Sequence, residues 1–183
     1  KVEDNKYYKT IAIKKENIYV YGYIIVANNK DKSALEISLS ESLVKVLPQV
    51  LSVIRNMFDL NSDPYAVYDV LKSANNIIPN CFQLGTRIPG SPNDFEMVVR
   101  AIIGQLISVE KGAEVLSNCC EKYGKKLETN IDGLEYVFPI PESISSLNNI
   151  YDELCSLKMT RTKADAIKGM AEIFTNEKLS FKE

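Results

Sequence analysis

The hydrophobic period of this chain changes once, near residue 41. Before that point large apolar side chains recur every second residue, as at Val20, Ile24 and Val26, which is the pattern of a strand with one buried face. From residue 43 onward they recur every three or four residues, as in amphipathic helices. Because strands precede helices, the sequence predicts an α+β fold, with a small α+β domain at 1–60 and a helical domain at 61–183.

Three strands are expected, at about 7–14, 18–27 and 35–39. Short polar segments separate them, so the sequence predicts an antiparallel meander. The second strand carries a row of tyrosines, Tyr19, Tyr21 and Tyr23, opposite its apolar face. This row is either half-buried against a neighbouring element, which is the more frequent arrangement, or free as a binding face.

Capping residues and prolines delimit the helices. Asp63 followed by Pro64 opens a helix to about residue 73, and Ser108 opens one that ends near Gly124. Pro48 either kinks a helix at 43–58 or begins its main part. We also expect a helix capped by Ser91 or Asn93 and ending at Gly104, a loop at 125–140, short helices at 141–147 and 150–156, a helix from Thr160 or Thr162 to about 175, a polar connector at 176–183, and an inner face of Val109, Ala113, Leu116 and Cys120 on the helix after Ser108.

The composition limits the chemistry. The chain has no His, which excludes a Ser-His-Asp triad, a His general base and a His-based metal site. Its four cysteines lack CxxC spacing, which excludes zinc-site and thioredoxin-type motifs, so we interpret them as free, buried thiols in a reducing cytoplasm. The net charge of −2 and the pI of about 5.4 do not indicate nucleic-acid binding by bulk charge.

The start of the sequence and its apolar runs indicate in which cellular compartment the protein is found. No secretory signal opens the sequence, and no apolar run is long enough to cross a bilayer. We therefore expect a cytoplasmic protein without a membrane partner. The sequence does not begin with Met, so we also expect its numbering to start inside a longer gene product.

The most unusual local feature is Gly-Gln-Leu-Ile-Ser at 104–108, at the corner between two predicted helices. At least one of Leu106 and Ile107 should point outward at a tight corner. Either both side chains tuck under the corner and Gln105 caps a backbone group, or the corner presents an apolar wedge of the kind that opens a base stack.

Two groups of charged residues have simpler explanations. Asp94 and Glu96 fall in the first turn of a helix, where the helix dipole favours acidic side chains, so we do not interpret them as acid–base catalysts. Four basic residues cluster at the start of the last predicted helix and either contact phosphates or, more commonly, form a solvated face; they are Lys158, Arg161, Lys163 and Lys168.

Several motifs together resemble one family. Arg-Ile-Pro-Gly at 87–90, Asp-Phe-Glu at 94–96 and the continuous segment Val-Arg-Ala-Ile-Ile-Gly-Gln-Leu-Ile-Ser-Val at 99–109 resemble the AlkA-type DNA-3-methyladenine glycosylase II family, in the helix-hairpin-helix DNA glycosylase superfamily. Further matches are Met-Phe-Asp-Leu at 57–60, Asp-Pro at 63–64, Lys-Tyr-Gly at 122–124, Phe-Pro-Ile-Pro at 138–141, Leu-Lys-Met at 157–159 and Arg-Thr-Lys-Ala at 161–164. The resemblance extends from about residue 7 to residue 180.

The resemblance implies a TBP-like N-terminal α+β domain, here incomplete at its front, before a partial helical glycosylase domain. It also implies an enzyme that binds double-stranded DNA with alkylated bases through the minor groove. Such an enzyme inserts a wedge, flips the damaged nucleotide and hydrolyses its N-glycosidic bond without a metal or redox cofactor. The family's wedge leucine corresponds to Leu106, and Gln105 lies beside the opened base-pair gap. Arg161 and Lys163 are candidate phosphate contacts.

The sequence departs from the family where catalysis is concerned. The family's Gly-rich hairpin and its pocket tryptophans have no counterpart, and its catalytic Asp is expected beyond Glu183. We therefore assign no catalytic residue within the segment and expect the segment alone to be inactive. The leading hypothesis is a monomeric base-excision glycosylase for alkylated purines such as 3-methyladenine. The alternatives are a related DNA- or damage-binding module without catalytic activity, and a protein-interaction domain that uses the tyrosine-bearing strand.

Overall fold

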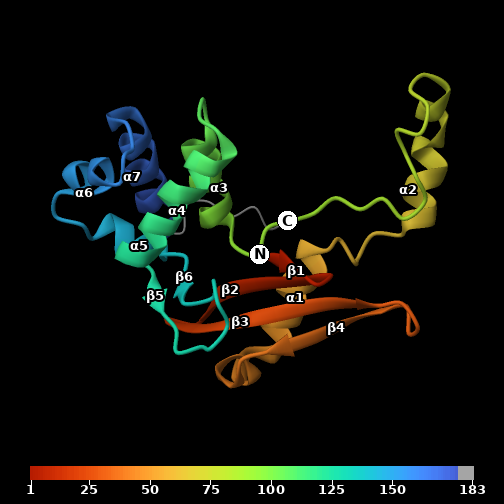
Figure 1. Cartoon of the computed structure of the whole chain (residues 1–183), viewed down its shortest axis with the longest axis horizontal. Helices are drawn as coiled ribbons and strands as arrows, with labels where there is room; N and C mark the ends of the chain where they lie inside the picture. Colours follow the sequence, from red (N-terminus) through yellow and green to blue (C-terminus); the bar gives the residue numbers. More distant parts are fainter. Residues whose placement is uncertain (177–183) are drawn as a thin grey trace. The chain divides into compact units, whose positions relative to one another are not determined.

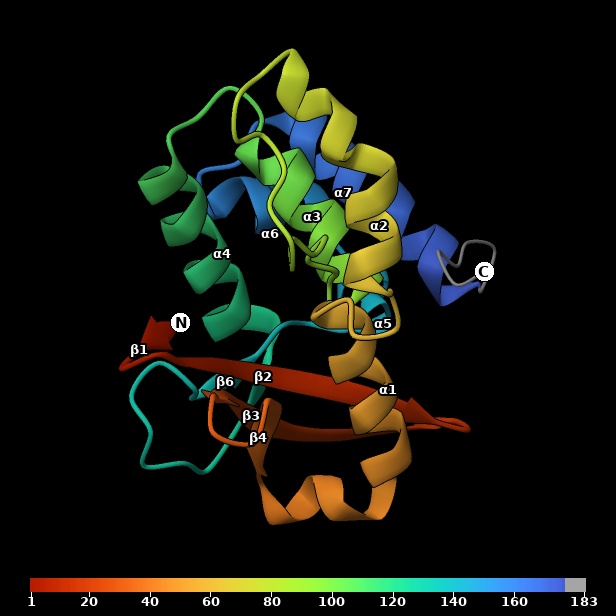
Figure 2. The same ribbon diagram turned by 90° about the vertical axis from the view of Figure 1, so that its right-hand side faces the viewer.

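The computed structural model describes residues 1–176, so the predicted connector at 176–183 lies outside the described residues except for Asn176. The described residues divide into two compact units, one made of residues 1–46 and 93–176, and one of residues 47–92 (Figures 1 and 2). In chain order the first unit contains β1 (Val2–Glu3), β2 (Lys6–Lys15), β3 (Ile18–Asn29), β4 (Ala34–Leu39), η1 (Glu41–Val46), α3 (Asp94–Gly104), α4 (Val109–Tyr123), β5 (Lys125–Lys126), β6 (Tyr136–Val137), α5 (Pro141–Ser145), α6 (Ile150–Ser156) and α7 (Arg161–Thr175). The second contains α1 (Leu47–Met57), α2 (Pro64–Leu71) and η2 (Lys72–Asn76).

The four-stranded sheet has the order β1-β2-β3-β4 and is antiparallel throughout. The three predicted strands are confirmed, and β1 is an addition of two residues. Val20, Ile24 and Val26 are buried as the alternation predicts, whereas Ile18 at the start of β3 is 70% exposed. The 3-10 helix η1 packs on β3, where a Cβ added at Gly22 would lie 2.6 Å from Leu43 Cγ. Glycine at this position therefore permits the close approach of η1 to the sheet.

The tyrosine row of β3 is half-buried by the same unit. Tyr19 donates a hydrogen bond from its hydroxyl to the Glu142 carboxylate in α5, at 3.1 Å, and its ring stacks on that of Tyr21. Burial raises the pKa of Tyr21, with a smaller contribution from Glu142. On β2, Thr10 Oγ1 donates to the Tyr136 carbonyl in β6 at 2.9 Å. These contacts agree with the packing interpretation of the row.

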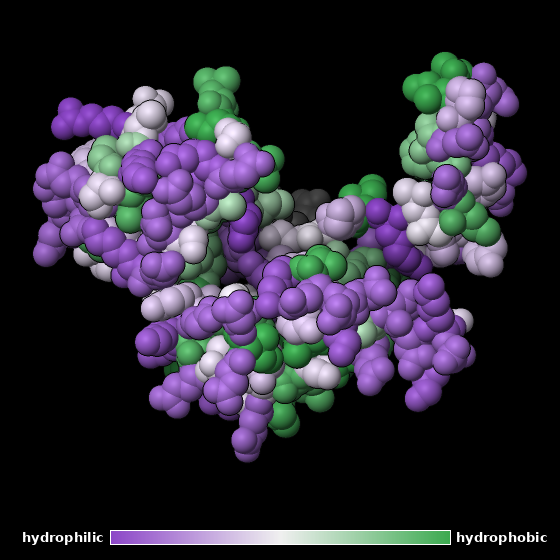
Figure 3. Space-filling model, in the orientation of Figure 1, coloured by the Kyte–Doolittle hydropathy of each residue, from purple (hydrophilic) through white to green (hydrophobic). Residues whose placement is uncertain are grey.

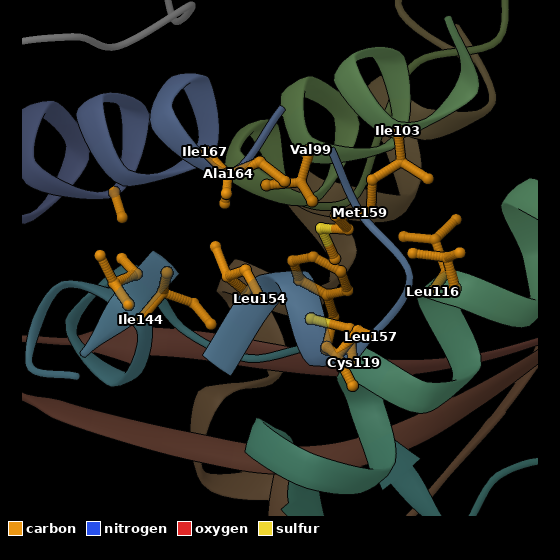
Figure 4. Packing of buried hydrophobic residues seen from close by; sticks show 14 of the residues in the cluster. Val99, Ile103, Leu116, Cys119, Ile144, Leu154, Leu157, Met159, Ala164 and Ile167 are labelled. Carbon is orange, nitrogen blue, oxygen red and sulfur yellow. The ribbon is translucent and has the colours of Figure 1, made fainter. Parts of the chain in front are cut away.

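The helices from α3 to α7 enclose one hydrophobic core (Figure 4). Phe95 in α3 is 2% exposed and lies edge-on to Phe138 and Phe174, with ring centroids 6.0 and 5.6 Å apart. Side chains from α4, α5, α6 and α7 complete the cluster, including Leu116, Ile144, Leu154 and Ile167. The predicted helices at 141–147 and 150–156 are confirmed as α5 and α6. The last predicted helix is confirmed as α7 and is capped by Thr160.

Two expectations for this unit are wrong in part, although Leu116 is buried and Cys120 packs against the core as predicted. The inner face of α4 consists of Gly112, Val115, Leu116 and Cys119, whereas Val109 and Ala113 are exposed. The buried face of the helix is therefore rotated from the predicted one, and Val109, its first residue, is 85% exposed. The predicted loop at 125–140 also contains β5 and β6, which pair with each other.

The second unit contains the other helical segments. Pro48 begins the main part of its helix, α1, rather than kinking it. Asp63 caps α2 by accepting a hydrogen bond from the Tyr65 amide at 2.9 Å, as predicted. The helix ends at Leu71 and continues as η2.

Two family motifs that are far apart in sequence meet in this unit. Arg87 donates to the carbonyls of Asp59 and Ser62, and the Ile88 amide donates to Asp59 Oδ2 at 3.1 Å. The Gly90 amide donates to the Met57 carbonyl at 3.0 Å. These bonds join 57–60 to 87–90 and close the chain segment between them.

Candidate functional site

The turn of residues 105–108, between α3 and α4, is the candidate site. Asn93 caps the start of α3 by accepting from the Glu96 amide at 2.9 Å, and Ser108 caps α4 by accepting from the Lys111 amide at 3.2 Å. Both caps follow from side-chain oxygens that satisfy free helical N–H groups. The turn lies at the end of α3 that points away from the sheet (Figures 1 and 2).

Leu106 occupies an unfavourable position at this turn. Its φ is +58°, in the left-handed region, which costs a residue with a Cβ about 1–2 kcal/mol. Its side chain is fully exposed, at 104%. A leucine that is both left-handed and unburied gains nothing from its own packing. Such a combination is typical of functional sites, where surrounding structure maintains it.

Ile107 behaves differently from Leu106. It is 37% exposed, and its Cδ1 lies 3.8 Å from the position of a Cβ added at Gly112. Ile107 therefore leans onto α4 while Leu106 points outward. The surface at this turn is apolar, and hydrophilic side chains lie around it (Figure 3).

The predicted basic cluster has several different environments. Lys158 pairs with Glu114 at 2.8 Å, and Lys168 lies over the Tyr151 ring and 3.9 Å from Glu172. Lys163 donates to the Ile103 and Gln105 carbonyls, each at 2.7 Å. Arg161, the first residue of α7, is exposed and has no ion pair to any other residue in 1–176.

Glu114 beside this cluster provides a pH-dependent test. Hydrogen bonds from Lys111 at 2.7 Å and Lys158 at 2.8 Å lower the pKa of Glu114 from 4.5 to about 2. Because its pKa is lower in the folded state, the stabilisation is complete above pH 4.5 and is lost as the pH falls toward 2. A carboxyl NMR titration should give a midpoint near 2, and Lys158→Met should move it toward 4.5. A wild-type midpoint of 4.5 would contradict the ion pairs.

The sequence did not reveal a buried charge cluster that joins the sheet to α3. Glu96 is 4% exposed and accepts from Lys9 of β2 and from Arg100 Nε at 2.8 Å. Asp94 remains explained by the helix dipole, but Glu96 is a buried ion-pair partner. The spacing of Glu96 and Arg100, four residues apart on a helix, is a signal that could have indicated half of the cluster.

The thiols and carboxylates offer no other obvious chemistry. Cys119 is buried and Cys120 partly buried, and burial raises their pKa values to about 12 and about 11, which keeps both thiols protonated. Cys81 is exposed, so the expectation that all four cysteines are buried is wrong for it. Within residues 1–176, no cluster of Cys, Asp and Glu could hold a metal ion, and no helix is long and apolar enough to cross a membrane.

Comparison with known families identifies the first half of the sequence. Residues 1–93 match the model of the AlkA N-terminal domain. The chain belongs to the AlkA N-terminal domain family. This membership confirms the resemblance, and it covers both the strands of the sheet and the second unit with its joined motifs.

The relatives of this AlkA-family chain are longer. DNA-3-methyladenine glycosylase 2 of Escherichia coli is 29% identical over 93% of the chain and 56% of its own length. DNA-3-methyladenine glycosylase of Bacillus subtilis is 28% identical over 98% of the chain and 58% of its own length. The AlkA-family chain thus spans slightly more than half the length of these curated relatives.

Solved structures support the fold. The 3-methyladenine DNA-glycosylase from Archaeoglobus fulgidus superposes with a TM-score of 0.71 at 20% identity, over 93% of the chain and 56% of that protein. The 8-oxoguanine glycosylase/lyase of Clostridium acetobutylicum, in complex with double-stranded DNA, gives a TM-score of 0.57 at 22% identity, over 92% and 56%. These structures confirm the mixed α+β architecture of the AlkA-family chain.

Proposed function

We propose that this chain is part of a DNA base-excision glycosylase that hydrolyses the N-glycosidic bond of alkylated purines such as 3-methyladenine. The observation that supports it most directly is Leu106, a left-handed and fully exposed leucine, in a chain that aligns over nearly its whole length with DNA-3-methyladenine glycosylases. A purely structural turn would favour glycine or asparagine at this φ and would bury an apolar side chain.

In this proposal the 105–108 turn enters the minor groove of duplex DNA. Leu106 fills the space that the damaged nucleotide leaves in the base stack, and Gln105 lies beside the opened pair. Unstacking costs a few kcal/mol per step, and an alkylated base, whose pairing is already weakened, opens more readily. The Arg161 guanidinium, free of protein ion pairs in residues 1–176, contacts a backbone phosphate.

The bond to be broken needs little from the protein beyond base opening. A cationic alkylated purine is a good leaving group, so a carboxylate that stabilises the positively charged sugar or activates water is sufficient. Glu96 is unsuited to this role because it is buried and bound to two cations. We assign the catalytic carboxylate to the whole protein and not to this chain. We also propose that the whole protein is a monomer that acts on DNA in the cytoplasm; the relatives, which are bacterial DNA glycosylases by name, support only the place of action.

Leu106→Ala tests the wedge. Because the wedge compensates for lost stacking, we expect the fraction of opened base to fall about tenfold or more, which corresponds to about 1.4 kcal/mol or more. The measurement is 2-aminopurine fluorescence in duplex DNA bound by the whole protein, together with release of 3-methyladenine. Melting temperature should not fall, since Leu106 buries no apolar surface.

Val109→Ala is the matched control, because Val109 is apolar, 85% exposed and only three residues away. It should leave base opening unchanged. If wild type and Leu106→Ala open the same fraction of bases, Leu106 is not the wedge. Binding and opening of alkylated DNA without any release of base would favour a damage-binding module over an enzyme.

A further inference from the structure

The Lys163 ammonium already has two hydrogen-bond partners within the protein. Lys163 lies in the first turn of α7, and its Nζ donates to the carbonyls of Ile103 and Gln105, each at 2.7 Å. These two carbonyls flank Gly104, the last residue of α3. One ammonium group thus links α7 to the point where α3 ends and the 105–108 turn begins.

The chemistry of a helix end explains why a cation is suited to this position. The last carbonyls of an α-helix have no partners within the helix, and their dipoles give the end a partial negative charge. A lysine ammonium donates hydrogen bonds to these carbonyls, and its positive charge compensates the partial negative charge of the helix end. In the described residues, the Gln105 side chain makes no hydrogen bond that would replace this one, and Gln105 itself is in an extended conformation. The Lys163 ammonium is therefore the group that fixes the backbone directly before Leu106.

Leu106 needs such a constraint. Its φ of +58° is unfavourable for a leucine, and its exposed side chain has no packing to hold it. The constraint on its N-terminal side comes from Lys163, and that on its C-terminal side comes from the Ser108 cap on α4.

We propose that Lys163 is a positioning residue that holds Leu106 in the outward, left-handed conformation, and that it acts through the turn rather than by contacting a DNA phosphate. This inference rests on the proposed function for the part that concerns DNA. It replaces the candidate phosphate contact for Lys163 and leaves that role to Arg161, its neighbour two residues before.

The first experiment concerns the free chain and needs no DNA. Backbone NMR order parameters are measured for wild type, Lys163→Met and Lys163→Arg. Lys168→Met is the control, because it removes the same charge from the same helix at a side chain that contacts Tyr151 instead of the turn. For Leu106 we expect a rigid value of about 0.85 in wild type and in Lys168→Met, and a value below about 0.6 in Lys163→Met. Lys163→Arg should remain rigid, because its guanidinium donors can still reach carbonyl oxygens.

The second experiment measures DNA binding by the whole protein as a function of salt. A phosphate contact contributes about 0.9 to the slope of log K against log salt, so losing one would lower the slope by that amount. For Lys163→Met we expect an unchanged slope and a fall of about tenfold in the fraction of opened base, measured by 2-aminopurine fluorescence and equal to that of Leu106→Ala. The double variant Lys163→Met/Leu106→Ala should lose no more base opening than either single variant, because both substitutions act through the Leu106 side chain.

The outcomes separate this inference from the proposed function. A rigid Leu106 in Lys163→Met overturns the positioning role whatever the DNA result, and so does a fall in salt slope of about 0.9. If Leu106 loses order in Lys163→Met while Leu106→Ala leaves base opening unchanged, the positioning role stands and the wedge function fails. Melting curves for each variant exclude general unfolding as the cause of a loss of order.

Discussion

Replacing Glu96 with leucine is expected to destabilise the first unit by about 3–5 kcal/mol, because removing one partner of a buried ion pair leaves the other charge uncompensated. Lys9 is the charge that would remain, with a side chain only 15% exposed. Arg100 is 51% exposed and can turn to water. The free energy of unfolding, measured by urea denaturation, gives the size of the effect.

The double variant Glu96→Leu/Lys9→Met separates the pair from its packing. Apolar replacement of both members of a buried pair is commonly neutral or stabilising, so the double variant should recover most of the stability lost in Glu96→Leu. Arg100→Met, which removes the exposed partner alone, should cost far less than Glu96→Leu. A double variant as unstable as Glu96→Leu would show that the carboxylate stabilises the unit by some other contact.

Phe95→Ala is the second large effect we expect, at about 3–5 kcal/mol for deletion of a buried phenylalanine. The ring is 2% exposed and touches the rings of Phe138 and Phe174. Those two residues come from the segment before α5 and from α7, so the loss affects contacts of widely separated segments. Urea denaturation followed by near-UV circular dichroism measures both stability and aromatic packing.

Tyr65→Ala is a useful comparison for Phe95→Ala, since Tyr65 is aromatic but 67% exposed. It should change the free energy of unfolding by less than about 0.5 kcal/mol, as is usual for surface positions. A similarly small loss in Phe95→Ala would mean that the core collapses around the missing ring more completely than a close-packed interior allows.

The local features of this fold could be predicted from the sequence. Asp63, Asn93, Ser108 and Thr160 each cap a helix within three residues, and a hydrogen bond of such short range depends on little else. The alternation in β3 correctly separated the buried face from the half-buried tyrosines because the pleat has a period of two.

The interactions that the sequence did not reveal are long-range or conformational. Lys9 and Glu96 are 87 residues apart, and no spacing rule links them. The outward direction of Leu106 depends on one backbone angle, which the motif at 104–108 left open between two arrangements. Lys163 was grouped with other basic residues because only the structure shows that its amine is already bound to the end of α3.

The hydrogen bonds between 57–60 and 87–90 close the segment between them into a loop. Its exit and return points are fixed to each other by Arg87, Ile88 and Gly90, whatever the length of chain between them. Closing a longer loop costs little extra, about 0.6 kcal/mol for each doubling of its length. A change in the length of residues 64–84 should therefore alter the stability of the second unit little, as long as the hydrogen bonds between 57–60 and 87–90 remain.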